Sequence, residues 1–179
     1  MSTELPIVLD SDFLSSFAWV KRLDILEALY SGRMVVLEEV LDELRRVPHL
    51  ASRIESSVKK GHIRLETMLA NSPEALRLAT LLDSGRYGSG EASCMAYLTE
   101  RDGILASNNV TDVEEFCIKY GRRLLTTADV LCQAYETGIV DLTKTNEIWV
   151  CMLSKRRKLP ASSFTEYLSA IQGGGSNQV

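Results

Sequence analysis

Acidic residues follow several apolar segments of this sequence, at positions where the folded chain could bring them together. Asp10 ends the apolar run "PIVLD", and Asp12 follows two residues later. Glu43 lies beside the apolar stripe of "EEVLDELRR", and Glu91 falls early in the helical segment "GSGEASCMA". Asp112 comes after the apolar run that opens "ILASNNVTD". The question is which chemistry such a set of carboxylates could perform.

Carboxylates that converge without a cation repel one another and raise one another's pKa values. Hard divalent ions resolve this conflict, and carboxylate and water oxygens favour Mg²⁺ or Mn²⁺. Mg²⁺ in particular keeps water positions from which hydroxide can be generated. The chemistry that we expect from such a site is in-line attack of water on a phosphodiester.

Each acid also has an ordinary structural interpretation. Asp12 could cap a helix, Glu43 could be a solvated surface residue, and Glu91 could complement a helix dipole. Asp10 directly abuts its apolar run, which makes it the stronger functional candidate; Asp12 is a secondary one.

The segment "ILASNNVTDVEEF" raises the same choice. Thr111 and Glu114 are spaced as a capping box, which would satisfy free N–H groups at a helix start. Capping does not account for Asn108, Asn109 and Asp112 together.

The elements that must position these residues follow from the apolar patterns. Strands are predicted at "LPIVLD", "RMVVL", "HIRLE", "GILAS" and "RRLLT". Helical spacing runs through "FLSSFAWVKRLDILEALYSG" and then over residues 38–46, 51–60, 73–83, 91–101, 112–120, 128–137, 146–155 and 163–171. Alternation of strands and helices predicts an α/β/α fold with a central parallel sheet, in which functional groups gather at the carboxyl ends of the strands.

Length and composition bound the remaining possibilities. A chain of 179 residues predicts one domain over residues 1–171, with a core at about 6–140, a helical extension at 141–171 and a solvated tail at 172–179. The net charge of −4 argues against tight nonspecific binding of nucleic acid. The four cysteines sit among apolar neighbours, so we expect them to be reduced and buried. No segment reaches membrane-spanning length, and we expect a cytoplasmic protein.

The ordered set "IVLDSDFL", "VLEEVLDEL", "GSGEASCMA" and "LASNNVTD" resembles the PIN-domain ribonucleases, which include toxin subunits of prokaryotic toxin/antitoxin pairs. The resemblance implies a metal-dependent ribonuclease that uses Mg²⁺ or Mn²⁺ and acts on RNA. It further implies an antitoxin protein as a partner, and a homodimer.

Carried over to this sequence, the resemblance assigns the catalytic acids to Asp10, Glu43, Glu91 and Asp112. Asp10, Glu91 and Asp112 would hold the metal, and Glu43 would complete the site or orient the attacking water. The segment "SNNVTDV" matches a family pattern at Ser107, Asn109 and Asp112, which gives Ser107 and Asn109 roles in positioning solvent or phosphate.

Further candidates lie later in the chain. Thr126 and Asp129 fit a second capping box. The alternative is a contact from Thr127 or Asp129 to metal-bound water or phosphate, so these two and Asn108 are secondary candidates. The run "SKRRKLP" is typical of a solvated surface. If it lies beside the acidic residues, Arg156 and Arg157 would bind the RNA backbone.

Two other interpretations stay open. "VLDSDFL" could be the D-x-D motif of haloacid-dehalogenase-type phosphatases, although the later motifs of that family have no convincing counterpart. A noncatalytic interaction module with the same fold could instead bind a protein partner through its exposed amides.

Overall fold

The computed structural model describes residues 4–174 of the chain. Its strands form one parallel sheet with the order β3-β2-β1-β4-β5. The strands are β1 (Ile7–Leu9), β2 (Met34–Leu37), β3 (Ile63–Glu66), β4 (Ile104–Ala106) and β5 (Arg123–Leu125). All five were predicted from their apolar runs, and the parallel sheet is confirmed.

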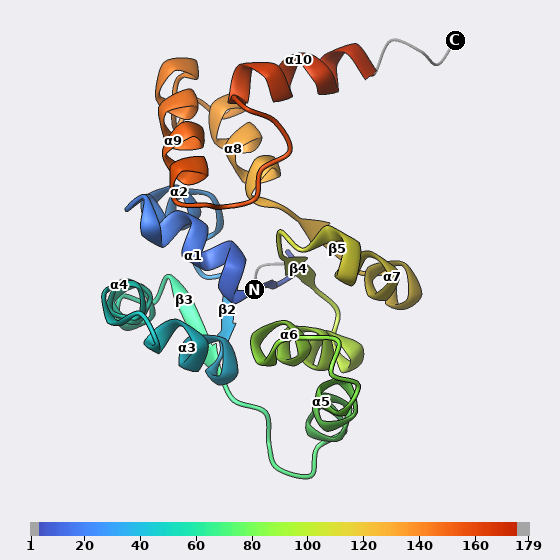
Figure 1. Ribbon diagram of the computed structural model, residues 1–179. Helices are drawn as coiled ribbons and strands as arrows, with labels where there is room; N and C mark the ends of the chain where they lie inside the picture. Colours follow the sequence, from blue (N-terminus) through green and yellow to red (C-terminus); the bar gives the residue numbers. More distant parts are fainter. Residues whose placement is uncertain (1–3, 175–179) are drawn as a thin grey trace.

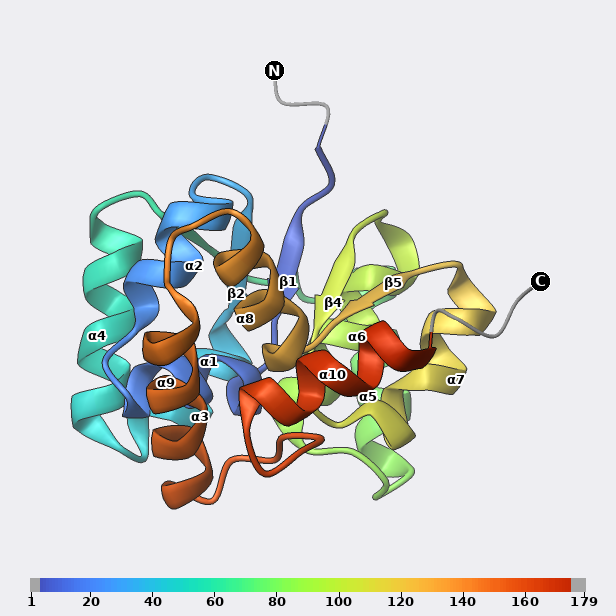
Figure 2. The ribbon, with the colours of Figure 1, turned by 90° about the horizontal axis from the view of Figure 1, so that it is seen from above.

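The described residues also form ten helices, which cover both faces of the sheet and so give three layers. α8 and α9 lie on one side of the sheet and α5 and α6 on the other (Figure 1; Figure 2 shows the view from above). They are α1 (Ser11–Trp19), α2 (Leu23–Tyr30), α3 (Glu38–Arg45), α4 (Pro48–Lys59), α5 (Pro73–Asp83), α6 (Ser89–Glu100), α7 (Val110–Tyr120), α8 (Thr127–Glu136), α9 (Leu142–Ser154) and α10 (Phe164–Gly174).

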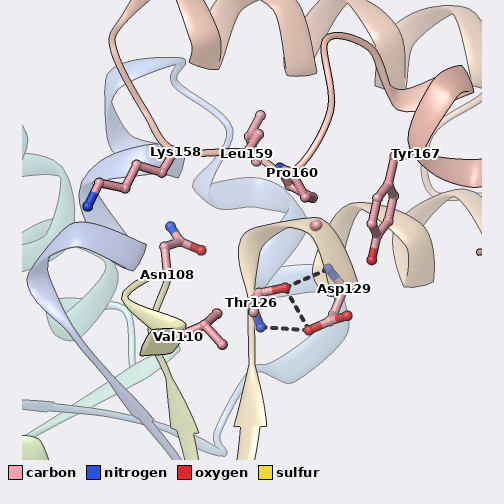
Figure 3. Close-up of a pocket in the computed structure, with 9 residues that line it drawn as sticks. Asn108, Val110, Thr126, Asp129, Lys158, Leu159, Pro160 and Tyr167 are labelled. Carbon is pink, nitrogen blue, oxygen red and sulfur yellow. Dashed lines mark hydrogen bonds between the residues drawn. The ribbon is translucent and has the colours of Figure 1, made fainter. Parts of the chain in front are cut away.

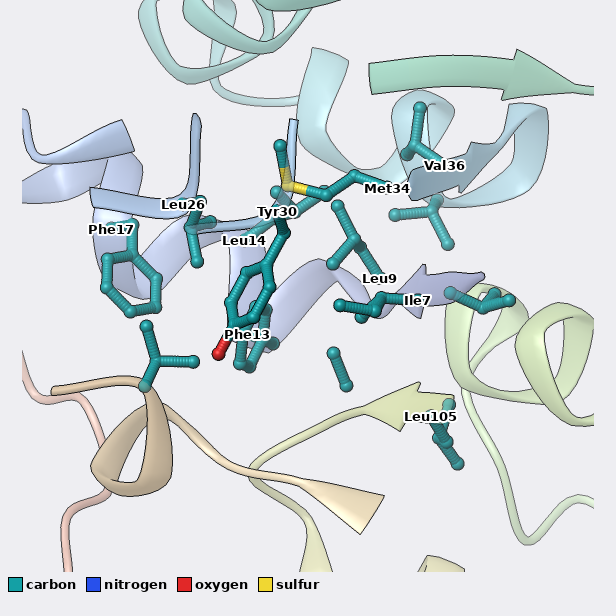
Figure 4. Close-up of a cluster of buried hydrophobic side chains, with 14 of the residues drawn as sticks. Ile7, Leu9, Phe13, Leu14, Phe17, Leu26, Tyr30, Met34, Val36 and Leu105 are labelled. Atoms are coloured by element: carbon teal, nitrogen blue, oxygen red, sulfur yellow. The ribbon is translucent and has the colours of Figure 1, made fainter. Parts of the chain in front are cut away.

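The core forms where the central strands meet the first two helices. β1 and β2 are buried along their whole length, as expected for strands that are covered on both faces. Their side chains pack against aromatic residues of α1 and α2, including Phe13, Phe17 and Tyr30 (Figure 4). This packing fixes the end of β1, and therefore the position of the residue that follows it.

The helical stretch after Asp12 is two helices and not one. Lys21 adopts a left-handed conformation with φ +58°. Its N–H donates to the carbonyl of Ala18, and the N–H of Arg22 donates to the carbonyl of Phe17 at 2.9 Å. This is the Schellman pattern that ends a helix. Lysine stands where glycine is usual, so the sequence carried no signal for the break.

The C-terminal extension completes the core. Trp149 of α9 and Phe164 of α10 are fully buried and their rings contact each other. The indole N–H of Trp149 donates to the carbonyl of Ala161 at 2.9 Å, which ties down the connection between the two helices. These helices therefore pack on the same hydrophobic core as the sheet.

The predictions for the C-terminal tail and for the cysteines are each wrong in part. Residues 172–174, which were assigned to a solvated tail, are the last residues of α10, and residues 175–179 lie outside the described part. Cys94, Cys117 and Cys132 are buried free thiols as predicted, but Cys151 is exposed. None of the helices within residues 4–174 is both long and apolar enough to cross a bilayer.

Candidate active site

The carboxyl ends of β1 and β4 mark the place where the strand order of the sheet reverses. The chain builds β1, β2 and β3 toward one edge and then returns to place β4 on the other side of β1. Ligands of open α/β sheets bind at such switch points. Here the N–H of Asp10 donates to the carbonyl of Ala106 at 3.0 Å, and the hydroxyl of Ser107 donates to Oδ2 of Asp10 at 3.2 Å. Asp10 and Ser107 thus lie together at the expected position.

Asp10 is a buried carboxyl group, only 4% exposed. Its Oδ1 accepts the N–H of Ser11 at 2.7 Å, which makes Asp10 the N-cap of α1. Burial raises the pKa of Asp10 from 3.8 to about 7, the nearby carboxylate of Glu91 adds to the rise, and the hydrogen bonds from Ser11 and Ser107 oppose it. A cation bound nearby would therefore favour the ionised form of Asp10.

Glu43 is held by two neighbouring helices. Its Oε2 accepts the hydroxyl of Ser11 at 2.6 Å, and its Oε1 accepts the N–H of Gly90 at 2.8 Å. A Cβ atom at position 90 would lie 2.7 Å from Oε2 of Glu43, so the carboxylate occupies space that only glycine leaves open. Sequence reasoning did not identify Ser11 or Gly90 as positioning residues, although both lie in motifs that it used, because neither side chain carries a charge.

One amide joins the two remaining acids. Nδ2 of Asn109 donates to Oε1 of Glu91 at 3.0 Å and to Oδ2 of Asp112 at 2.6 Å. Burial raises the pKa of Glu91; the hydrogen bond from Asn109 lowers it, and the carboxylates of Asp112 and Glu43 raise it further. Asn109 also precedes α7 as its N-cap residue but makes no side-chain capping bond. The capping box predicted for Thr111 and Glu114 is therefore wrong, since both lie inside the helix.

These groups surround a small polar cavity of about 200 Å³. Its lining residues are Asp10, Ser11, Asp12, Glu43, Gly88, Glu91, Asn109 and Lys158. We call this cavity the acidic pocket. Asp112 does not line it and reaches it only through Asn109. Three of the four predicted catalytic acids are thus brought to one cavity, and the fourth is one hydrogen-bonded side chain away.

The basic run places a residue at the acidic pocket that the sequence did not single out. Lys158 lines the pocket, whereas Arg156 is exposed and does not. Arg157 donates to Oδ1 of Asp12 at 3.2 Å and to the hydroxyl of Ser15 at 3.1 Å, which anchors the run to α1. Asp12 is therefore an ion-pair partner in the first turn, and the interpretation of Asp12 as the helix cap is wrong.

The secondary candidates form a separate hydrogen-bond network. Oδ1 of Asn108 accepts the N–H of Thr127 at 2.9 Å, and its Nδ2 donates to the hydroxyls of Thr127 at 2.9 Å and Ser16 at 3.3 Å. Asn108 therefore ties α8 to α1. The predicted capping box of Thr126 and Asp129 is confirmed at the start of α8.

The oxygen donors of the acidic pocket suit a hard divalent cation, although they are not grouped tightly enough to form a complete set of ligands. Within residues 4–174, no group of three or more His, Cys, Asp or Glu side chains is arranged to hold a metal ion. The pocket nevertheless offers carboxylate oxygens of Asp10, Glu43 and Glu91, which are the ligand type of Mg²⁺ and Mn²⁺. Mg²⁺ binds through few carboxylates and keeps several waters, so it fits these donors.

Comparison with known proteins supports this arrangement at the level of the family. A family model described as a PIN domain matches residues 6–172, from β1 into α10. No curated protein matches the chain. The match favours the PIN resemblance over the haloacid-dehalogenase alternative, and it includes the C-terminal helices that carry Lys158 to the acidic pocket. Because the matched residues cover nearly all of the chain, it belongs to the PIN-domain family.

Proposed function

We propose that this protein hydrolyses RNA phosphodiester bonds at the acidic pocket with Mg²⁺ or Mn²⁺ as its cofactor. The observation that carries the proposal is the burial of Asp10 at the switch point, beside Glu91 and with a pKa raised to about 7. A buried acid of this kind destabilises the fold when it is ionised, unless a bound cation balances its charge. Membership of the PIN-domain family agrees with nuclease chemistry.

The acidic residues take distinct roles in this proposal. Asp10 and Glu91 would hold the ion inside the pocket, and Asp112 would complete the set from the start of α7. A bound divalent ion would lower the pKa of water and neutralise charge on the phosphate. Glu43, held by Ser11 and Gly90, would accept a proton from the attacking water and orient it.

The amide and hydroxyl groups position these acids. Ser107 holds Oδ2 of Asp10, and Asn109 holds Glu91 and Asp112 at a fixed separation. Both N–H groups of the Asn109 amide are used in these bonds, so a contact from Asn109 to a phosphate oxygen would replace one of them. In this proposal both side chains act by orienting the acids, and their predicted roles in positioning solvent or phosphate stay predictions.

The basic segment supplies the phosphate contacts. Lys158 lines the acidic pocket, and Arg156 and Arg157 precede it. Although the whole chain has a net charge of −4, these cations would give a locally positive surface beside the acidic pocket, where the RNA backbone would lie. Exchange of Arg156 for alanine should weaken RNA binding in a salt-dependent way and leave metal affinity unchanged. Exchange of Arg157 would in addition remove its ion pair with Asp12 at the pocket.

The similarity to toxin subunits extends the proposal to partners and location. We expect a cytoplasmic nuclease that an antitoxin protein restrains, and we expect a homodimer. Exposed apolar side chains such as Leu76 on α5, 65% exposed, and Ile118 on α7, 76% exposed, are available for an interface. Sedimentation of a monomer at micromolar concentration would count against the homodimer.

The experiment is a cleavage assay with purified protein on structured and unstructured RNAs. We expect cleavage with Mn²⁺ or Mg²⁺, none with excess EDTA, and recovery after the metal is returned. Asp112→Asn should lower the rate by at least about a hundredfold, because an ion held by one carboxylate fewer stabilises the transition state less. Binding of RNA without cleavage under any metal would favour the noncatalytic interaction module.

A further inference from the structure

A second cavity lies directly beside the acidic pocket, at the carboxyl ends of β4 and β5. Its volume is about 440 Å³, and its lining residues are Asn108, Val110, Thr126, Ala128, Asp129, Lys158, Leu159, Pro160 and Tyr167. Figure 3 shows Asn108 and Val110 on one side, Tyr167 on the other and Leu159–Pro160 above. We call it the side pocket. The C-terminal segment supplies one wall of it, so the side pocket exists only because α9 and α10 fold back over the sheet.

The side pocket and the acidic pocket share a boundary. Lys158 lines both cavities. The consecutive residues Asn108 and Asn109 line one cavity each. An occupant of the side pocket that extends past Lys158 therefore enters the acidic pocket. The ammonium group at this boundary favours an anionic linkage between the two parts of such an occupant.

The walls of the side pocket suit a flat and largely apolar ring. Val110, which is 40% exposed, lines it together with Leu159, Pro160 and the ring of Tyr167. The Tyr167 ring is itself supported by Trp149, with centroids 5.3 Å apart and an interplanar angle of 31°. Rigid aromatic and apolar surfaces of this kind are the platforms on which single-stranded nucleic acids stack their bases.

One polar group at the floor is placed to read the edge of such a ring. The N–H and the hydroxyl of Thr126 both donate to Oδ2 of Asp129, at 2.8 and 2.7 Å. Oδ1 of Asp129 accepts no hydrogen bond from residues 4–174, so it stays available as an acceptor. Carboxylates of Asp and Glu accept hydrogen bonds from the exocyclic amino groups of bases.

We propose that the side pocket binds the nucleobase of a nucleotide whose phosphate lies at Lys158, next to the acidic pocket, and that Asp129 favours a base with an exocyclic amino group. This inference rests on the proposed function for its substrate class, RNA. It adds a specificity subsite that the acidic residues do not supply. The cleavage position in RNA would then depend on the base that enters this pocket.

The test measures binding of three small probes to the full chain in EDTA, where no hydrolysis occurs. CMP, UMP and ribose 5-phosphate share a phosphate and a ribose, but the last has no base, and only CMP carries an exocyclic amino group. We expect CMP to bind at least about tenfold more tightly than ribose 5-phosphate, as loss of one stacked base predicts. CMP should also bind more tightly than UMP.

A matched pair of variants locates the site. Val110→Trp should fill the side pocket and lower CMP affinity to the level of ribose 5-phosphate. Val150→Trp makes the same substitution at a residue of α9 that is 54% exposed and lines no part of the side pocket, and it should bind CMP like the parent protein. Circular dichroism of both variants establishes that they are folded.

The outcomes separate this inference from the proposed function. Equal affinity for CMP and ribose 5-phosphate, or unchanged CMP binding by Val110→Trp, would overturn the subsite even if the protein cleaves RNA. Equal affinity for CMP and UMP, with both above ribose 5-phosphate, would overturn the role of Asp129 alone. Base-dependent binding that Val110→Trp abolishes, in a protein that cleaves no RNA, would support the subsite and contradict the proposed hydrolysis.

Discussion

The N–H of Gly90 donates to Oε1 of Glu43 at 2.8 Å, and the absence of a side chain at position 90 leaves the space that the Glu43 carboxylate fills. The bond joins α6 to α3 and sets the direction of the carboxylate toward the acidic pocket. A glycine that looks like a weak helix residue in the sequence is therefore a determinant of site geometry.

We predict that Gly90→Ala lowers RNA cleavage by at least about tenfold without a loss of stability. The new Cβ would stand 2.7 Å from Oε2 of Glu43, so the flexible carboxylate must move, while alanine suits the helix better than glycine by up to about 1 kcal/mol. The matched control is Gly173→Ala in α10, where an added Cβ would meet nothing within 4 Å. Equal rates for the two variants, measured beside their thermal unfolding, would contradict this role.

The adjacent asparagines should separate stability from activity. Asn108→Ala removes three hydrogen bonds to Ser16 and Thr127, and Thr127 is fully buried, so we expect a loss of about 1–3 kcal/mol in the free energy of unfolding. Asn109→Ala removes bonds to two acids that repel each other and should change stability little but lower the cleavage rate. Urea denaturation and cleavage assays on both variants check this, and the reverse pattern would refute it.

The pKa of Asp10 predicts a pH-dependent penalty in the protein without metal. Folding raises this pKa from 3.8 to about 7. The preference of the folded state for neutral Asp10 therefore contributes fully to the free energy of unfolding below pH 3.8, and this contribution is lost as the pH rises to about 7. Asn keeps the cap of α1 and carries no charge. In EDTA, Asp10→Asn should therefore be more stable than the parent at pH 8, by about 4 kcal/mol at most.

The comparison of unfolding free energies at pH 5 and pH 8 is the decisive part of that experiment. The advantage of Asp10→Asn should be smaller at pH 5, where the parent carries a mostly protonated Asp10. A difference that stays constant between the two pH values would mean that Asp10 does not carry the penalty.

Lys158 should make one contact to the RNA backbone. We expect Lys158→Ala to weaken RNA binding and to reduce the slope of log K against log salt by about 1, since one phosphate contact is lost. Lys60, exposed at the end of α4, is the control position, and Lys60→Ala should leave the slope unchanged. Salt titrations of RNA binding followed by fluorescence anisotropy measure both slopes. Identical slopes for the two variants would remove Lys158 from the interface.

Local signals in the sequence were sufficient to predict most elements of the fold. The apolar runs of β1 and β4 identified both strands that meet at the switch point, which placed Asp10 and Ser107 correctly. α5 was predicted with its observed bounds, and it begins with two local features of a helix start, the cap by Ser72 and a proline at its first position. These features depend on residues that are neighbours in the chain.

Two of the features that were missed depend on residues far apart in the chain. Lys158 reaches the acidic pocket only because Trp149 and Phe164 bury the two last helices against the core. Ser11 meets Glu43 from another helix, and neither residue type signals that contact. The helix break at Lys21 was missed for a local reason, because a lysine adopts the conformation that usually marks a glycine.

The most direct test of hydrolysis at the acidic pocket is the single-turnover rate of RNA cleavage by Asp10→Asn with saturating Mn²⁺ at pH 8. Asp42→Asn is the matched control, because Asp42 is an exposed acid that pairs with Arg45 outside the pocket. We predict that Asp10→Asn cleaves at least about a hundredfold more slowly than the parent, although it is the more stable protein without metal, and that Asp42→Asn cleaves at the parent rate. Cleavage by Asp10→Asn at the parent rate would contradict the account and assign the activity to another site or to a contaminant.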